Sequence, residues 1–196
     1  MSSGPLLVVL TGPSGAGKDS LLAELRSRSD AYHIAVNATT RDPRDGEQEG
    51  VDYYFVSNEE FQRMIRDSEL LEHAIVYGQD KGVPRSPIRH ALASGHDVLL
   101  RTDIQGARTI KRIVPGAVSI FIAPPSEDEL RRRVRKRGGD SKEQVKLREE
   151  TARQEMAAAP EFDYEVVNDD LQKCADEIEA IMSRERSRAN REAVRV

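Results

Sequence analysis

A glycine-rich stretch near the start of the chain has the residue types of a phosphate-binding loop. It runs from Gly12 to Ser20 with the sequence GPSGAGKDS, after an apolar run at 6–10 and before helix-forming residues at 21–25. Glycines let the backbone curl until successive N–H groups face one anion, and the N-terminus of the next helix adds a positive end. Lys18 contributes a full positive charge. The sequence therefore predicts a site for the phosphates of a nucleoside triphosphate.

The loop departs from the usual pattern at its metal-binding position. The pattern G-x-x-x-x-G-K-[ST] ends on a hydroxyl that ligates Mg²⁺, whereas this chain has Asp19 there. Ser20 comes one residue later, about 100° further round the helix. Asp19 is therefore a candidate metal ligand. The candidate residues of the loop are Gly12, Pro13, Ser14, Gly15, Ala16, Gly17, Lys18, Asp19 and Ser20.

Further polar residues could contact a ligand or have an ordinary structural role. Arg41 and Arg44 flank Pro43 on a stiff loop, where two guanidinium groups either grip a phosphate or stay solvated. Glu72 interrupts an apolar stretch, so it either faces outward from a strand or points into a pocket. Asp103 ends a buried strand, where ligands bind in parallel sheets. It either faces a metal or substrate or caps the next helix.

Composition limits the classes of partner. A chain of 196 residues fits one domain, and its net charge of −4 offers no general surface for nucleic acid. The basic run 131–137 is a solvated helix face, a nucleic-acid patch or, with the glycines at 138–139, part of a hinge. The one cysteine, Cys174, lies in an apolar helical stripe and suits a reducing compartment. No apolar run approaches 18 residues, so we expect a cytoplasmic protein without a membrane span.

Strand and helix patterns alternate along the chain. This alternation predicts an α/β, doubly wound parallel sheet flanked by helices. The expected strands are 6–10, 33–36, 51–56, 71–78, 96–103, 117–123 and 164–167. The expected helices begin near residues 18, 57, 87, 104, 126, 141 and 171, and the second of them ends near 70.

Several motifs in order resemble the guanylate kinase family, from about Pro5 to about Arg186. They are GPSGAGKD, TTRDPRDGE, GVDYYFVS, ELLEHAIVYG, DIQGA, RGGDS and VVNDD. The resemblance implies a P-loop kinase that phosphorylates GMP with ATP and Mg²⁺. It implies a core of 1–36 with 87–196, a GMP-binding insertion at 37–86, and an arginine lid at about 126–158 within the core.

The resemblance also implies roles for individual residues. Arg41, Arg44 and Tyr53 would bind the GMP phosphate, Glu72 would accept hydrogen bonds from guanine, and Asp103 would complete the GMP site. On the ATP side, Lys18 and three lid arginines would face the phosphates, and one asparagine would lie near the adenine. These arginines are Arg133, Arg137 and Arg148, and the asparagine is Asn168.

Four positions depart from the family pattern besides Asp19. Asn37 stands where serine is common near guanine, and Lys81 replaces a phosphate-binding tyrosine. Val83 replaces a serine or threonine, and Arg101 stands where an acidic residue is common. The set is similar to a subgroup of bacterial and plant-organelle guanylate kinases with Gly-Lys-Asp in the loop, so Asn37 and Lys81 remain candidate GMP ligands.

Two other functions fit parts of the pattern. A ribose 1,5-bisphosphate phosphokinase shares the fold and the string GKDSLLAELR, but has no need of a carboxylate for guanine. A guanylate-kinase-like module would bind another protein without catalysis, although such modules typically lose the loop lysine or the lid arginines. Here Lys18 and the lid arginines are present, so we expect an enzyme with ATP and GMP as partners and no obligate protein partner.

Overall fold

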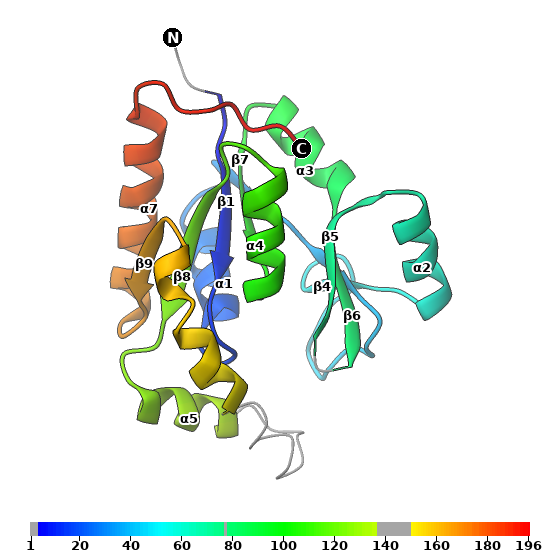
Figure 1. Cartoon of the computed structure of the whole chain (residues 1–196), viewed down its shortest axis with the longest axis horizontal. Helices are drawn as coiled ribbons and strands as arrows, with labels where there is room; N and C mark the ends of the chain where they lie inside the picture. Colours follow the sequence, from blue (N-terminus) through cyan, green and yellow to red (C-terminus); the bar gives the residue numbers. More distant parts are fainter. Residues whose placement is uncertain (1–3, 77, 137–149) are drawn as a thin grey trace.

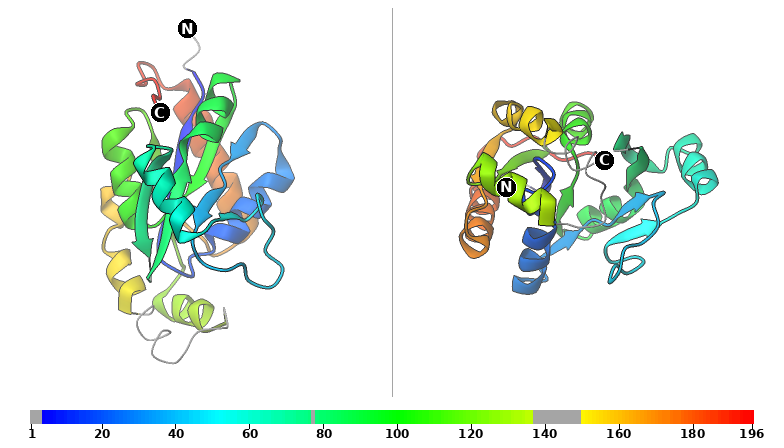
Figure 2. Two further views of the ribbon diagram at one scale, coloured as in Figure 1. Left: turned by 90° about the vertical axis from the view of Figure 1, so that its right-hand side faces the viewer. Right: turned by 90° about the horizontal axis from the view of Figure 1, so that it is seen from below.

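The computed structural model describes residues 4–76, 78–136 and 150–196. They form two sheets side by side, with helices around the larger one (Figures 1 and 2). The larger sheet is parallel throughout and has the order β2-β7-β1-β8-β9. Its strands are β1 (Leu7–Thr11), β2 (Tyr32–Ile34), β7 (Asp97–Arg101), β8 (Val118–Ala123) and β9 (Tyr164–Val167).

Alternate residues of these strands supply two separate apolar layers. In β1, Val8 and Leu10 pack with helices α1 and α7, whereas Leu7 and Val9 pack with α3 and α4. Side chains alternate across a strand, so a parallel sheet with apolar residues at every position must be covered on both faces. The helices are α1 (Lys18–Arg28), α3 (Arg85–Ala93), α4 (Ile104–Ile113) and α7 (Leu171–Ser187). The α/β fold expected from the alternating pattern is confirmed.

The second sheet has the order β4-β3-β6-β5 and lies beside α4 (Figure 1). Its strands are β3 (Asn37–Thr39), β4 (Tyr53–Phe55), β5 (Leu70–Val76) and β6 (Gln79–Pro84), and α2 (Asn58–Arg66) covers it. Phe61 and Met64 of α2 pack on Ala38 and Leu70. Ser57 caps α2 by accepting a hydrogen bond from the Glu60 N–H.

The structure explains the altered bounds of three expected elements. The second helix ends at Arg66 rather than near 70, because Asp67 closes it and Leu70 pairs with Pro84 in the second sheet. The expected strand 33–36 ends at Ile34, since the chain passes there from one sheet to the other. The expected strand 96–103 ends at Arg101, and the next two residues turn into α4.

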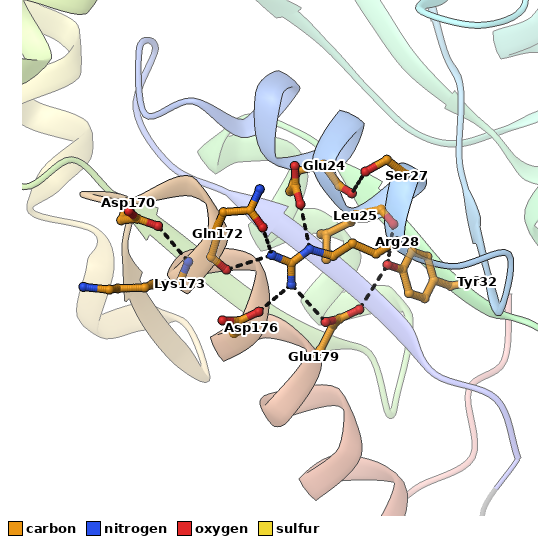
Figure 3. Close-up of polar contacts among 10 residues, drawn as sticks. All are labelled: Glu24, Leu25, Ser27, Arg28, Tyr32, Asp170, Gln172, Lys173, Asp176 and Glu179. Atoms are coloured by element: carbon orange, nitrogen blue, oxygen red, sulfur yellow. Dashed lines mark hydrogen bonds and ion pairs between the residues drawn. The ribbon is translucent and has the colours of Figure 1, made fainter.

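A charged cluster fixes α7 against α1 (Figure 3). Arg28 ends α1 and donates to Glu24 in its own helix at 2.7 Å. Its guanidinium also reaches α7, where it contacts Asp176 at 2.5 Å, Glu179 at 3.2 Å and the Gln172 carbonyl at 3.1 Å. These contacts attach the C-terminal helix to the helix that carries Lys18.

Between β8 and β9, the described residues include three helical segments. The basic helix α5 (Glu127–Lys136) packs through Leu130 and Val134 onto Ala152, within helical residues 150–156, and the short η1 (Ala159–Glu161) follows. The supposed hinge at 138–139 lies outside the described residues. No helix in the described part of the chain is long and apolar enough to cross a membrane.

Candidate active site

The glycine-rich loop lies between β1 and α1, at the carboxyl end of the parallel sheet. Gly12, Gly15 and Gly17 all have positive φ, and Gly17 is the N-cap of α1. A Cβ at Gly12 would collide with the Ile122 carbonyl of β8, so this glycine permits close backbone packing as well as an unusual dihedral. The Lys18 ammonium folds over the loop and donates to the carbonyls of Gly12 at 2.7 Å and Pro13 at 3.0 Å.

The loop opens into a cavity of about 560 Å³ between the two sheets. The structure brings most of the predicted site residues into its wall. These are Gly12, Ser14, Gly15, Gly17, Lys18, Asp19, Ser20, Asn37, Arg41, Arg44, Tyr53, Glu72, Lys81, Asp103, Arg133 and Asn168. Pro13 and Ala16 belong to the loop but do not line the cavity. Arg137 and Arg148 lie outside the described residues, and their roles stay predictions.

Glu72 points into the cavity from β5. Its side chain is buried, and Oε1 accepts a hydrogen bond of 3.0 Å from the Thr102 hydroxyl. The buried Oε2 has no hydrogen-bond partner among the described residues. Burial, and after it the nearby Asp103, raise the pKa of Glu72 to about 7. Of the two interpretations left open by the sequence, the structure supports the inward-facing carboxylate.

Asn37 supplies a second buried acceptor to the same cavity. Its Nδ2 donates to the Arg101 carbonyl at 2.8 Å, and because a carbonyl only accepts, this contact fixes the orientation of the amide. Its buried Oδ1 has no hydrogen-bond partner among the described residues. A ligand that presents N–H donors would satisfy both Asn37 and Glu72.

Arg41 and Arg44 meet at Glu47. Arg41 forms a two-pronged ion pair with Glu47, both contacts being 2.6 Å, and the Arg44 N–H donates to the same carboxylate at 2.8 Å. The Arg41 guanidinium lies 4.8 Å from the centre of the Tyr53 ring. Pairing with Arg41 lowers the pKa of Glu47. Arg41 is therefore held in place rather than solvated, and an arriving phosphate would share it with Glu47.

The remaining two candidates for GMP contacts, Lys81 and Asp103, also line the cavity. Lys81 lines the cavity from β6, where it pairs with Thr39 of β3. Asp103 is the N-cap of α4, and its Oδ1 accepts from the N–H groups of Gln105 and Gly106. The helix-cap alternative for Asp103 is thus observed, and its charge also acts on the pKa of Glu72.

Asn168 and Arg133 lie beside the phosphate loop. Asn168 is buried, and its Nδ2 donates to the Ala16 carbonyl at 2.8 Å. Arg133 donates to the Asn168 carbonyl at 3.1 Å and to Glu129 at 2.6 Å. Other arginines of the basic run also pair with acidic residues of α5, as Arg132 does with Glu129. This pairing accounts for much of the charge of the described part of that run.

Asp19 contacts a cation provided by the chain itself. Its half-exposed carboxylate forms an ion pair with Arg101 of β7. Arg101 therefore compensates the negative charge of Asp19 from within the chain.

Two of the lining residues that sequence reasoning missed contact predicted site residues. Thr102 holds Glu72, and Glu155, from the helical residues 150–156, accepts a hydrogen bond of 3.2 Å from the Ser14 N–H. Burial raises the pKa of Glu155, although the positive charge of Lys18 opposes the shift. Position 102 directly follows a buried strand, which is a usable signal, whereas nothing in the sequence near Glu155 marks it.

The carboxylate of Asp19 suits a divalent ion that binds together with the phosphates of a nucleotide. No group of three or more His, Cys, Asp or Glu side chains that could hold a metal occurs among residues 4–76, 78–136 and 150–196. Mg²⁺ commonly takes one or two protein carboxylates and completes its shell with phosphate oxygens and water. Asp19 at the start of α1 offers one such carboxylate, so the donor set fits a substrate-borne Mg²⁺.

Comparisons with known proteins agree with this geometry. The family model described as guanylate kinase matches residues 5–185. A guanylate kinase of Synechococcus sp. (strain JA-3-3Ab) is 48% identical over 90% of this chain and 81% of its own length. One from Carboxydothermus hydrogenoformans is 43% identical over 97% of this chain and 94% of its own.

A solved structure gives the same result. The crystal structure of guanylate kinase from Anaplasma phagocytophilum has a TM-score of 0.81 and 36% identity, covering 97% of this chain and 91% of the other. A match of the family model to nearly the whole chain, with relatives above 40% identity, leaves little of the sequence unaccounted for. The chain belongs to the guanylate kinase family.

Proposed function

We propose that this chain transfers the γ-phosphate of ATP to GMP, giving ADP and GDP. The observation that carries the proposal is the buried Glu72 carboxylate, which faces the cavity with Oε2 unpartnered among the described residues. The phosphate loop opens into the same cavity. The group proposed to recognise the base and the loop proposed to bind the polyphosphate therefore line the same cavity.

Guanine fits the acceptors that the cavity presents. Its N1–H and exocyclic amine are adjacent donors, and one carboxylate can accept from both. Adenine has no such pair, so AMP would leave Glu72 buried and unpaired, at a cost of about 1–3 kcal/mol or more. The acceptor Oδ1 of Asn37 lies in the same wall and adds to this preference.

The phosphate of GMP would lie against the cationic side of the cavity. Arg41, Arg44 and Lys81 line it together with Tyr53. Arginine forks match phosphate oxygens, and Lys81 adds a charge where other members use a tyrosine hydroxyl. We therefore assign these four residues, with Asn37 and Glu72, to GMP binding, and Asp103 to shaping the site as the cap of α4.

The ATP phosphates would occupy the loop. The backbone from Gly12 to Ser20, the N-terminus of α1 and Lys18 provide donors and positive charge there, and Arg133 and Asn168 border the loop. Asp19 would hold Mg²⁺, which would supply positive charge to offset that of the ATP phosphates.

The chemistry needs orientation and charge compensation more than proton transfer. A phosphate oxygen of GMP attacks the γ-phosphorus in line, and the bond from this phosphorus to the oxygen that leaves with ADP breaks. Lys18 offsets the developing negative charge, and we expect Arg137 and Arg148 to do so from the lid. Exclusion of water from the space between the sheets protects ATP from hydrolysis.

The proposed domain boundaries follow the two sheets. We propose a core of 1–36 and 87–196, including a lid at about 126–158, and a GMP-binding insertion at 37–86. In support, the second sheet and α2 use residues from Asn37 to Pro84. We also propose a cytoplasmic location, because the one cysteine, Cys174, is buried and unpaired.

The test is ADP production from ATP and Mg²⁺ with different acceptors. We expect activity with GMP to exceed that with AMP, UMP or ribose 1,5-bisphosphate by at least about a thousandfold. The same assay is run with dGMP as a further acceptor. Glu72→Gln should lower kcat/KM for GMP about a hundredfold, because the amide presents a donor to guanine N–H groups.

A matched control is Glu59→Gln, which removes an exposed carboxylate from α2 in the same part of the fold. It should leave kcat/KM for GMP unchanged. Preference for the sugar phosphate, or equal activity of the Glu72→Gln variant with GMP, would overturn the proposal.

A further inference from the structure

Arg101 is placed between the two nucleotide sites that the proposed function requires. It is the last residue of β7 and pairs in register with Leu10 of β1, the strand that leads into the phosphate loop. Its side chain is only 15% exposed and lines the cavity. A charged side chain this enclosed must be compensated by specific partners.

The partners of Arg101 come from both the ATP side and the GMP side of the cavity. On the ATP side, Nη1 forms the ion pair with Asp19 of α1. On the GMP side, Nη2 donates to the Asp52 carbonyl at 2.9 Å, and the guanidinium lies 4.5 Å from the centre of the Tyr53 ring. One side chain therefore connects the helix that starts at the phosphate loop with the strand that carries Tyr53.

Two arginines meet at Tyr53, and each is paired with a carboxylate. Arg41 lies 4.8 Å from the ring centre and is bound by Glu47, whereas Arg101 lies 4.5 Å from it and is bound by Asp19. Two guanidinium groups around one ring form a local concentration of positive charge, which suits a phosphate dianion. The difference is that the counter-ion of Arg101 belongs to the ATP loop.

We propose that Arg101 is a third arginine for the GMP phosphate, besides Arg41 and Arg44, held by Asp19 until the ATP site fills. The inference rests on the proposed function. Binding of ATP with its cation draws the Asp19 carboxylate toward the cation, and the charge of Arg101 then becomes available to the phosphate beside Tyr53. Filling one site thus raises affinity at the other, and linkage makes the effect reciprocal.

The ion pair between Asp19 and Arg101 explains together two departures from the family pattern. Asp19 stands where the family pattern has a hydroxyl, and Arg101 stands where it has an acidic residue. An aspartate among phosphates would repel them, and an isolated arginine in a closed wall would be costly. Each residue offsets the cost of the other.

The experiment measures GMP binding by calorimetry, with and without AMP-PNP and Mg²⁺. For the wild-type chain we expect AMP-PNP to tighten GMP binding about fivefold, within the range of ordinary site coupling. Asp19→Asn releases Arg101, so it should tighten GMP binding in the absence of AMP-PNP and remove most of the coupling. Arg101→Gln should weaken GMP binding about tenfold and also remove the coupling.

Without AMP-PNP, Asp19→Asn should tighten GMP binding and Arg101→Gln should weaken it, while both variants lose the effect of AMP-PNP on GMP binding. These opposite changes in GMP affinity distinguish the mechanism from damage to the fold. Arg112→Gln, which changes an exposed arginine at the end of α4, is the matched control and should behave as wild type. Unchanged coupling in Arg101→Gln, or weaker GMP binding in Asp19→Asn without AMP-PNP, would overturn the inference and leave the proposed function intact. A wild-type chain that binds no GMP would overturn both.

Discussion

The Thr102 hydroxyl donates a hydrogen bond of 3.0 Å to Oε1 of Glu72, across the boundary between the parallel sheet and the second sheet. Thr102 directly follows β7, and Glu72 lies in β5. The bond fixes one carboxylate oxygen and leaves Oε2 directed to the cavity. Orientation of the proposed guanine-binding group therefore depends on both sheets being in place.

The protonation state of Glu72 should govern GMP affinity near neutral pH. Burial raises its pKa to about 7, and only the ionised carboxylate accepts from both guanine donors. Because the pKa is raised, the binding form predominates above pH 7 and is lost below it. The dissociation constant for GMP should therefore rise about tenfold between pH 8 and pH 6, as measured by calorimetry.

The control for this experiment is Glu72→Gln. The GMP phosphate also titrates in this range, but it contributes equally to both proteins. The ratio of the two dissociation constants therefore isolates the carboxylate. A ratio that stays constant from pH 6 to pH 8 would contradict the role of Glu72.

Gly106 is predicted to be irreplaceable because it packs against the Glu72 carboxyl group. A Cβ there would lie 2.8 Å from the Glu72 Cδ and would also collide with the Thr102 hydroxyl. Gly106→Ala should therefore weaken GMP binding at least tenfold and lower the free energy of unfolding by about 1–3 kcal/mol, despite the higher helix propensity of alanine.

Gly4→Ala is the control, because nothing lies within 4 Å of a Cβ at that position. Denaturant unfolding and calorimetry on both variants test the point. Normal GMP binding by Gly106→Ala would mean that Glu72 and Thr102 can move aside, and that their geometry is not the source of specificity.

Local sequence patterns were sufficient for the phosphate loop and the parallel core. Glycines with positive φ at 12, 15 and 17 have a direct structural reason, and the apolar strands at 6–10 and 117–123 are found as β1 and β8 with small changes in bounds. These features depend on neighbours in the chain. The inward direction of Glu72 needed the family resemblance, since an interrupted apolar stretch fits either face of a strand.

Contacts between distant segments could not be predicted in the same way. Asp19 and Arg101 are 82 residues apart, and Ser14 and Glu155 are 141 apart. Nothing in the local pattern of either residue identifies its partner. The same reason explains the wrong end of the second expected helix: Leu70 suits a helix by type, and only pairing with Pro84 makes it a strand residue.

Removal of the Lys18 charge should affect turnover more than nucleotide binding. In the structure its ammonium donates to the carbonyls of Gly12 and Pro13, so it already lies over the loop that would hold the phosphates. Lys18→Met should lower kcat by about 10²–10³, as loss of one group that stabilises transition-state charge does elsewhere, and change the ATP dissociation constant less than tenfold.

Steady-state kinetics and calorimetry separate these two effects. Lys173→Met, in the first turn of α7, provides a control that removes a lysine outside the cavity. Unchanged kcat in Lys18→Met would contradict the proposed role.

Glu155 presents a negative charge to the loop that would bind ATP. Its Oε2 accepts from the Ser14 N–H, a group that a phosphate oxygen would use, and burial raises its pKa. Glu155→Gln keeps an acceptor for Ser14 but removes the repulsion, so ATP should bind about fivefold more tightly, equivalent to ~1 kcal/mol. Because the pKa is raised, the carboxylate is less ionised at lower pH, and the gain over wild type should be larger at pH 8 than at pH 6.

Calorimetry with ATP at both pH values tests this expectation, with Glu165→Gln on the exposed face of β9 as the control. The opposite result is equally informative. The carboxylate also acts on Lys18, whose charge opposes the rise in its pKa. Weaker ATP binding by Glu155→Gln would therefore show that Glu155 holds Lys18 and the loop in their binding conformation, rather than occupying the place of a phosphate.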